Sequence, residues 1–375
     1  MDRVIHGNKL IVAKKILVVH PYLKDAIGGG EEVLLKILEV LTDLKHDVYL
    51  LGELPSGSIF DDLPISSIKQ IHYHSDVNFK SKRFQAHQRL LFRHLKLAHK
   101  LRKEIGKMDL EITTQDTMYF IGAGKKRVAY VHFPENLTRM QKPDLKHRWF
   151  WKLFYYPIVF QLKRLIKKTD LLMCNSLYTQ NAIMKCWGCE AELVYPPVDV
   201  KAFQPAQKEH LVVSVGRFVP IKNYELIAQV AKLMPDVKFV IAGRKPPDVS
   251  YYDKIVAIKP DNMDLSVDVT RTDVSALLGR AKIYLHGMVD EPFGISVGEA
   301  MAAGCVPVIH NSGGPKEIVG SYGFFYNNVE ECVKAIAGAL QSDINPNDVA
   351  DRAKMFGADI FKKNFVTTLE RNGFL

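Results

Sequence analysis

Apolar and polar positions follow two recurring patterns along this chain: continuous apolar runs and amphipathic stretches. The continuous runs predict buried strands of a parallel sheet, at residues 16–19, 47–52, 211–216 and 237–243. Apolar residues at helical spacing predict amphipathic helices at residues 31–44 and 224–233. Because each half of the chain holds a strand, a helix and a second strand, the sequence predicts two similar α/β domains.

We expect the connection between the two halves at Pro196 and Pro197, because adjacent prolines favour a stiff, extended chain. The predicted domains are residues 1–195 and 196–350, and a last helical stretch covers 351–371. A length of 375 residues suits two such domains. No segment approaches the roughly 18 uninterrupted apolar residues of a membrane span.

A strand, a loop and a helix follow one another late in the second half. The run at 282–287 predicts a buried strand, and a helical pattern starts at Ser296 and stops before Gly304. The loop between them should therefore lie over a helix N-terminus. There the N–H groups of Gly294 and Ile295 can face a phosphate or a sugar hydroxyl, which the helix dipole favours.

Two carboxylates frame this loop. Glu291 lies within it, and Glu299 lies about one turn inside the helix. We expect one of them to accept hydrogen bonds from sugar hydroxyls and the other to reach a ribose. The simpler alternative is a solvated loop acid beside an ordinary acid of a first helical turn.

The first half offers a second group of candidates at strand ends. Three adjacent glycines, which let a backbone approach a ligand closely, precede the first helix: Gly28, Gly29 and Gly30. The next residue, Glu31, is either a cleft residue or a first-turn helix acid, and we expect the helix to begin there. His132 ends the strand VAYV and is the better candidate for the reacting centre; His20 ends the first strand and ranks second. A packed or exposed histidine is the alternative for each.

Positive charge for a diphosphate should come from the loop after residue 216. This loop carries Arg217 and Lys222, which would neutralise charge as a glycosidic bond breaks. No Asp-x-Asp occurs anywhere in the sequence. We therefore expect chemistry without a metal ion and without a cofactor.

The net charge of +10 is concentrated in two segments. Residues 80–107 hold ten Lys or Arg against one acid, and residues 142–168 hold eight against one. The second segment adds aromatic residues, a composition typical of a helix in an anionic membrane interface. We assign this membrane face to Trp149, Trp151, Lys163, Arg164, Lys167 and Lys168. No nucleic-acid recognition motif accompanies these basic segments, so we expect no nucleic-acid partner. The alternative to a membrane face is a pair of ordinary helices with solvated lysines. The case for this alternative is stronger for residues 80–107 than for residues 142–168.

The string from Asp290 to Gly314, with seven residues between Glu291 and Glu299, resembles the E-x7-E signature of family 4 retaining glycosyltransferases. The resemblance implies a GT-B fold, in which two Rossmann-like domains face a cleft and a C-terminal segment, here 351–375, crosses back to the first. It also implies that Glu291 contacts the transferred hexose and Glu299 the nucleotide ribose. The G-R-x4-K pattern matches Arg217 and Lys222.

By the same resemblance, four residues have catalytic roles: His132, Glu291, Arg217 and Lys222. The donor site comprises Gly29, Gly30, Arg217, Lys222, Glu291, Phe293, Gly294, Ile295 and Glu299. The acceptor side comprises His20, Gly28 and Glu31.

Three strings, HPYLKDAIGGGEEVL, YVHFP and VIHNSGGPKEIV, narrow the resemblance. They are similar to GDP-mannose-dependent α-1,2-mannosyltransferases that extend lipid-linked oligosaccharides at the cytosolic side of a membrane. At 375 residues the chain is shorter than the eukaryotic members, and we expect it to act without their N-terminal membrane anchor. The expected activity is hexose transfer, with mannose from GDP-mannose favoured, to a lipid-linked or glycan hydroxyl, by a cytoplasmic protein bound peripherally to the membrane. A UDP-sugar-dependent transferase, a sugar-nucleotide epimerase and a catalytically silent binding protein are the alternatives.

Overall fold

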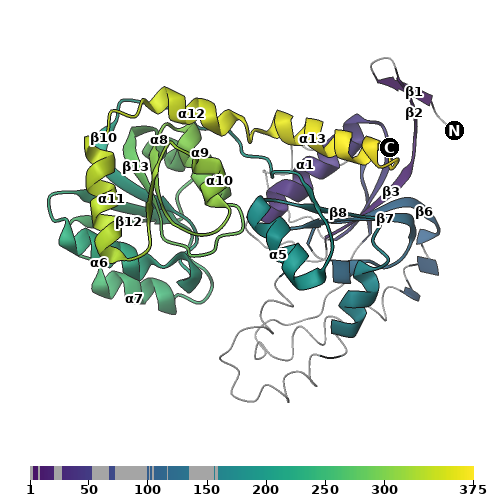
Figure 1. Cartoon of the computed structure of the whole chain (residues 1–375), viewed down its shortest axis with the longest axis horizontal. Coiled ribbons are helices and arrows are strands. Elements are labelled where there is room, and N and C mark those ends of the chain that lie inside the picture. The colour runs from purple at the N-terminus through teal and green to yellow at the C-terminus, as the bar shows by residue number, and fades with distance from the viewer. Residues whose placement is uncertain are drawn as a thin grey trace. The chain divides into compact units, whose positions relative to one another are not determined.

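A computed structural model describes residues 3–6, 9–20, 28–52, 67–71, 99–100, 102–103, 105–115, 117–134, 156 and 159–375. The chain forms two compact units (Figure 1). Unit 1 comprises Met1–Tyr195 and Lys362–Leu375, and unit 2 comprises Pro196–Phe361. Each is built around its own parallel sheet.

The sheet of unit 1 has the strand order β5-β4-β3-β6-β7-β8-β9, and its strands are parallel throughout. The strands are β3 (Lys15–Val19), β4 (Asp47–Leu51), β5 (Lys69–Ile71), β6 (Met108–Thr113), β7 (Gly124–Val131), β8 (Leu171–Cys174) and β9 (Glu192–Leu193). A separate antiparallel pair is formed by β1 (Arg3–His6) and β2 (Lys9–Val12). The buried apolar runs predicted at 16–19 and 47–52 are thus neighbouring strands of one sheet.

Helix α1 (Gly29–Asp43) follows β3 and buries the predicted apolar face, including Val33, Ile37 and Leu41. The expected start at Glu31 is wrong by two residues, because Gly28 is the N-cap and accepts the first helical hydrogen bond, from Glu32 N–H. Two of the three glycines therefore lie in the first helical turn. Further along, η3 (Thr117–Tyr119) precedes β7, and α5 (Leu177–Trp187) begins at the N-cap Ser176.

The sheet of unit 2 has the order β12-β11-β10-β13-β14-β15, again all parallel. Its strands are β10 (Glu209–Val215), β11 (Lys238–Gly243), β12 (Met263–Val267), β13 (Ala281–His286), β14 (Val306–His310) and β15 (Phe324–Tyr326). The strand order reverses direction between β10 and β13, and ligands of such sheets bind beyond the carboxyl ends of strands at a reversal of this kind.

Helices cover both faces of this second sheet (Figure 1). One face carries α6 (Tyr224–Leu233), α7 (Ser250–Ile258) and α11 (Val329–Gln341), whose apolar residues share one buried core with the strands. The other carries α8 (Arg271–Arg280), α9 (Ile295–Ala302) and α12 (Pro346–Lys354), with the short α10 (Pro315–Val319) beside α9. The short η4 (Pro220–Lys222) leads into α6.

The predicted final helix is two helices, α12 and α13 (Ala358–Arg371), separated at residues 355–357. The break follows from a tertiary contact: Val198 forms a β-bridge with Gly357, and Val198 N–H donates to Phe356 O at 2.8 Å. Because α12 packs on α9, it belongs to unit 2, and the chain joins unit 1 at Lys362 rather than at residue 351.

Three contacts fix the end of the chain to unit 1. Lys362 pairs with Asp43 at the end of α1, and Arg371 pairs with Glu192 of β9. Lys14 Nζ donates to Phe374 O at 2.9 Å. A C-terminal segment therefore returns to the first unit, as the GT-B resemblance implies.

Candidate nucleotide-sugar site

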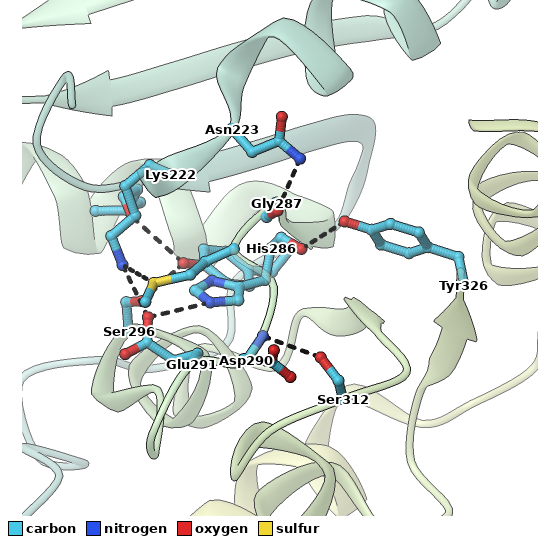
Figure 2. Close-up of polar contacts among 12 residues, drawn as sticks. Lys222, Asn223, His286, Gly287, Asp290, Glu291, Ser296, Ser312 and Tyr326 are labelled. Atoms are coloured by element: carbon cyan, nitrogen blue, oxygen red, sulfur yellow. Dashed lines mark hydrogen bonds and ion pairs between the residues drawn. The ribbon is translucent and has the colours of Figure 1, made fainter. Parts of the chain in front are cut away.

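The loop between β13 and α9 is held in place by a second loop (Figure 2). Asp290 N–H donates to Ser312 Oγ and Gly314 N–H donates to Glu291 O, both at 2.9 Å. A Cβ at Gly313 would lie 2.5 Å from Glu291 O, so the close approach of the two loops requires glycine. The backbone of Glu291 is consequently fixed before any ligand arrives.

The Glu291 carboxylate lies between a lysine and a histidine (Figure 2). Its Oε2 is 3.0 Å from Lys222 Nζ and 3.4 Å from His286 Nε2, and its side chain is 17% exposed. Burial alone would raise the pKa of Glu291, but the Lys222 ammonium and the His286 ring outweigh it and lower this pKa to about 2. Burial lowers the pKa of His286, with help from Lys222, so the ring is neutral at pH 7. Glu291 is thus a firmly ionised acceptor.

Lys222 reaches Glu291 from the loop between β10 and α6. It ends η4, and the next residue, Asn223, has φ +53° and donates to Gly287 O at 3.3 Å. The Lys222 ammonium also lies 3.8 Å from Met288 Sδ. Arg217 comes from the same loop but is exposed, and its guanidinium makes no hydrogen bond within the part of the chain that the structure describes. The structure therefore joins Lys222, but not Arg217, to Glu291.

Glu299 lies on α9 and is paired with a residue that the sequence did not single out. Its Oε1 accepts from Arg271 Nη2 at 2.9 Å, and the same nitrogen lies 3.1 Å from Asp199 Oδ2. Burial raises the pKa of Glu299, an effect that Arg271 opposes and Asp199 reinforces. The second carboxylate is therefore held by one arginine, which is itself shared with another acid.

Two sequence candidates near the helix start have different surroundings. Gly294 is the N-cap of α9 with φ +96°, and Ser296 Oγ accepts from Tyr284 O–H at 2.9 Å. The Phe293 ring is buried and packs edge-on against Phe356, with centroids 5.9 Å apart. Phe293 thus anchors the loop through its side chain, and a donor contact would have to use its main chain. Ligand contacts by the N–H groups of Gly294 and Ile295 stay a prediction.

In unit 1 the structure brings His132 next to Gly30. A Cβ at Gly30 would lie 3.5 Å from His132 Nε2, and that nitrogen is buried without a partner among the described residues. Burial lowers the pKa of His132 to about 4, although a hydrogen bond with the Thr114 backbone opposes this. His132 is therefore a neutral imidazole at the start of α1, with one nitrogen open to a further hydrogen bond.

The remaining first-unit candidates are committed to internal contacts. His20 is fully buried, with Nδ1 2.5 Å from Thr114 Oγ1 and Nε2 3.3 Å from Gln115 Nε2. Glu31 Oε2 accepts from Gly28 N–H at 2.9 Å and closes the first turn of α1, as a helix-capping acid does.

Four of the six residues of the predicted membrane face can be described. Residues 159–166 are helical, with Leu162, Leu165 and Ile166 buried in a core that includes β7 and β8. The four cations of the face, Lys163, Arg164, Lys167 and Lys168, are exposed. Tyr156 and Phe160 are 64% and 58% exposed and stack with centroids 6.3 Å apart. Trp149 and Trp151 lie outside the described residues.

Among the helices that the structure describes, none has the length and apolar character needed to cross a bilayer. Within the same residues, no group of three or more His, Cys, Asp or Glu side chains is placed to hold a metal ion.

Sequence reasoning missed three residues of the site: His286, Arg271 and Asp199. His286 ends a buried strand, which is the signal that singled out His132 in unit 1. Thr270 and Asp273 form a capping box that marks the start of α8 and so places Arg271 at the edge of the sheet. Asp199 follows the two linker prolines and carries no local signal.

Comparisons with known proteins agree with this geometry. The family description "Glycosyltransferase Family 4" matches residues 27–202, and "Glycosyl transferases group 1" matches residues 198–356. Anabaena HepE, solved in complex with UDP and glucose, has a TM-score of 0.69 at 18% identity, covering 95% of this chain and 99% of that one. This likeness shows the GT-B fold.

Several relatives by sequence carry the name GDP-Man:Man(3)GlcNAc(2)-PP-Dol alpha-1,2-mannosyltransferase. The mouse protein of this name is 31% identical over 229 residues, which are 50% of this chain and 46% of that protein. The Caenorhabditis elegans protein is 26% identical over 96% of this chain and 91% of its own. The chain thus spans about half the length of the mouse relative. The paired family matches, the GT-B fold and the E-x7-E carboxylates together place this chain in glycosyltransferase family 4.

Proposed function

We propose that this protein transfers mannose from GDP-mannose to a hydroxyl of a lipid-linked glycan, with retention of the α configuration. One observation carries the proposal: Lys222, Glu291 and Glu299 gather at the carboxyl edge of the unit 2 sheet in a family 4 chain. The names of the relatives support GDP-mannose as the donor.

The contacts suggest how a donor would be held. A diphosphate arriving near Lys222 would take over the ammonium now paired with Glu291. Glu291 would then be free to accept from hexose hydroxyls, still held in place by its backbone contacts and by His286. The exposed Arg217 can add a second positive charge, and Glu299 can accept from the ribose.

For the reaction itself, we infer departure of the diphosphate followed by attack of the acceptor hydroxyl on the same face of the sugar. Positive charge from Lys222 and Arg217 would stabilise the leaving group as charge develops. The neutral His132 can exchange a hydrogen bond with the sugar through Nε2, which is buried and has no partner among the described residues. The absence of Asp-x-Asp from the sequence supports transfer without a metal ion, which turnover in EDTA would test.

A thermal-shift panel tests the donor, because a ligand that binds only the folded state raises its melting temperature. The panel contains GDP, GDP-mannose, UDP and UDP-hexoses without added metal. Selective stabilisation by GDP and GDP-mannose is expected. A response to UDP compounds alone would indicate a UDP-sugar as the donor. No response to any of these compounds would favour a catalytically silent protein. Consumption of the donor without an acceptor would favour an epimerase.

We also propose that the acceptor is reached at an anionic, cytosolic membrane surface. Tyr156 and Phe160 are exposed and stack on each other, and the four exposed cations lie within the next eight residues of the chain. Such a set suits rings at headgroup depth and lysines on phosphates. Binding to vesicles of neutral lipid with and without phosphatidylserine tests this face.

Reversing the charge of Lys163, Arg164, Lys167 and Lys168 to Glu should release the protein from anionic vesicles. A matched control reverses four exposed lysines of unit 2: Lys232, Lys316, Lys334 and Lys354. Because both variants lose the same net charge, equal release would show that only overall charge matters and would contradict a dedicated face.

A further inference from the structure

The Glu299 carboxylate has one oxygen engaged and one available. Oε1 accepts from Arg271 Nη2 at 2.9 Å, and Oε2 has no hydrogen-bond partner among the described residues. The Glu299 side chain is 10% exposed, so few water molecules can take the place of a missing donor. Whatever binds to Oε2 must donate a hydrogen bond, because a carboxylate only accepts.

Arg271 is fixed by three neighbours. It is the first residue of α8, directly after the capping box of Thr270 and Asp273. Its Nη2 bridges Glu299 to Asp199 Oδ2, which lies 3.1 Å away, and its guanidinium lies 5.1 Å from the centre of the Phe203 ring. A planar guanidinium held by two carboxylates and a ring has little freedom to turn.

We infer that Arg271 is a positioning residue for the donor: it holds Oε1 of Glu299 so that Oε2 is left to accept from a ribose hydroxyl of the bound nucleoside diphosphate. This inference rests on the proposed function and deepens it. Arg271 acts through Glu299, and Asp199 and Phe203 keep Arg271 in place.

The charges around Glu299 support the assignment. Burial raises the pKa of Glu299, and Asp199 raises it further, while Arg271 is the one described group that lowers it. Tyr284 also faces this carboxylate, but burial raises its pKa to beyond the range of neutral solution, so it is uncharged. Arg271 thus favours the ionised form, and a charged acceptor binds a hydroxyl about twice as strongly as a neutral one.

The test removes hydroxyls from the ligand and the guanidinium from the protein. Isothermal titration gives the Kd of GDP and of 2′,3′-dideoxy-GDP for the full chain and for Arg271→Met, which keeps an apolar stem over Phe203. The wild-type protein should bind GDP at least about tenfold more tightly than the dideoxy compound, the usual loss for a hydrogen bond to a charged group. Arg271→Met should lose most of that difference while its affinity for the dideoxy compound stays near the wild-type value.

Two further variants separate positioning from general damage. Arg280→Met removes another arginine of α8, which pairs with the exposed Glu209 at 3.2 Å, and should leave both affinities unchanged. Arg271→Lys should restore part of the preference, because an ammonium supplies the charge without the planar fork.

Full preference for GDP in Arg271→Met would overturn the inference and leave the proposed function standing. Equal binding of both compounds by the wild-type protein would overturn the ribose contact but keep the nucleotide site. Failure of the wild-type protein to bind either compound would overturn the donor site and the inference with it.

Discussion

Glu291 and Glu299 lie eight residues apart and are both largely buried, yet their surroundings differ. Glu291 lies close to two nitrogen groups, those of Lys222 and His286. The pKa of this carboxyl falls to about 2 despite burial. Among the described residues, Arg271 is the single cation paired with Glu299, and its half-exposed guanidinium is shared with Asp199. Burial keeps the pKa of Glu299 raised.

The difference shows that burial alone does not decide the state of a site carboxylate; the number and exclusivity of its donors do. Glu291 is preorganised and charged in the absence of ligand, which suits a group that meets the reacting sugar. Glu299 depends on one shared arginine, which suits a group that completes its hydrogen bonds only when the nucleotide binds.

The largest expected effect comes from Glu291→Gln. Loss of the charged acceptor at the transferred sugar should lower kcat by at least about a hundredfold, as loss of an electrostatic group at a reacting centre does. Glu299→Gln should lower kcat/KM by about tenfold or less, mainly through KM, because the ribose does not react. Steady-state mannose transfer measures both, and equal losses would contradict the comparison.

Lys222→Met should have the next largest effect. It removes a charge for the diphosphate and leaves Glu291 with His286 alone, so kcat should fall by roughly thirtyfold to a hundredfold. The control is Lys334→Met, which removes an exposed lysine of α11. If Arg271→Met impaired kcat as strongly as Lys222→Met, the two cations would not have the separate roles proposed here.

The dependence of folding stability on pH should differ in sign between the two carboxylates. The folded pKa of Glu291 lies below its ordinary 4.5, so its stabilisation is present above about pH 4.5 and is lost as the pH falls toward 2. The folded pKa of Glu299 is raised, so its contribution is favourable at low pH and is lost as the pH rises through that pKa.

Denaturant unfolding of the two glutamine variants between pH 3 and 7 measures this difference. At pH 7, Glu291→Gln should be destabilised by about 2 kcal/mol, the usual cost of leaving buried donors without their acceptor. Glu299→Gln should be as stable as the wild-type protein or more so. A destabilised Glu299→Gln beside an unaffected Glu291→Gln would reverse the comparison.

The smallest expected effect comes from His286→Leu. The ring is neutral and buried, and its Nε2 lies 3.4 Å from Glu291 without a well-aligned hydrogen bond, so its removal should lower kcat by no more than about fivefold. His286→Gln, which keeps an N–H donor, should recover part of the loss. A leucine variant with wild-type kcat would show that Lys222 alone positions Glu291.

Local patterns in the sequence predicted strands β3, β4, β10, β11 and β13 and helices α1, α6 and α9. The predicted helix at 224–233 is α6, and the helix expected at Ser296 begins one residue earlier and ends before Gly304, whose φ of +74° is left-handed. The errors have tertiary causes. The pairing of Val198 with Gly357 breaks the last helix, and helical periodicity carries no information about such a contact.

The same limit applies to the site. Glu291 and Glu299 were found because they share one short motif, and Lys222 because it follows a strand. Arg271 meets Glu299 from 28 residues away and Asp199 from 72 residues away, so only the fold brings the three together. The ligand roles of all the site residues stay predictions until a donor is bound.

The decisive experiment is a mannose-transfer assay. The full chain is incubated with GDP-mannose and a lipid-linked glycan acceptor in anionic vesicles with EDTA, and the mannosylated product is quantified beside that of Glu291→Gln. We expect product from the wild-type protein and at least about a hundredfold less from a folded Glu291→Gln protein. Equal product from the two, or none from a wild-type protein that GDP stabilises, would contradict this expectation.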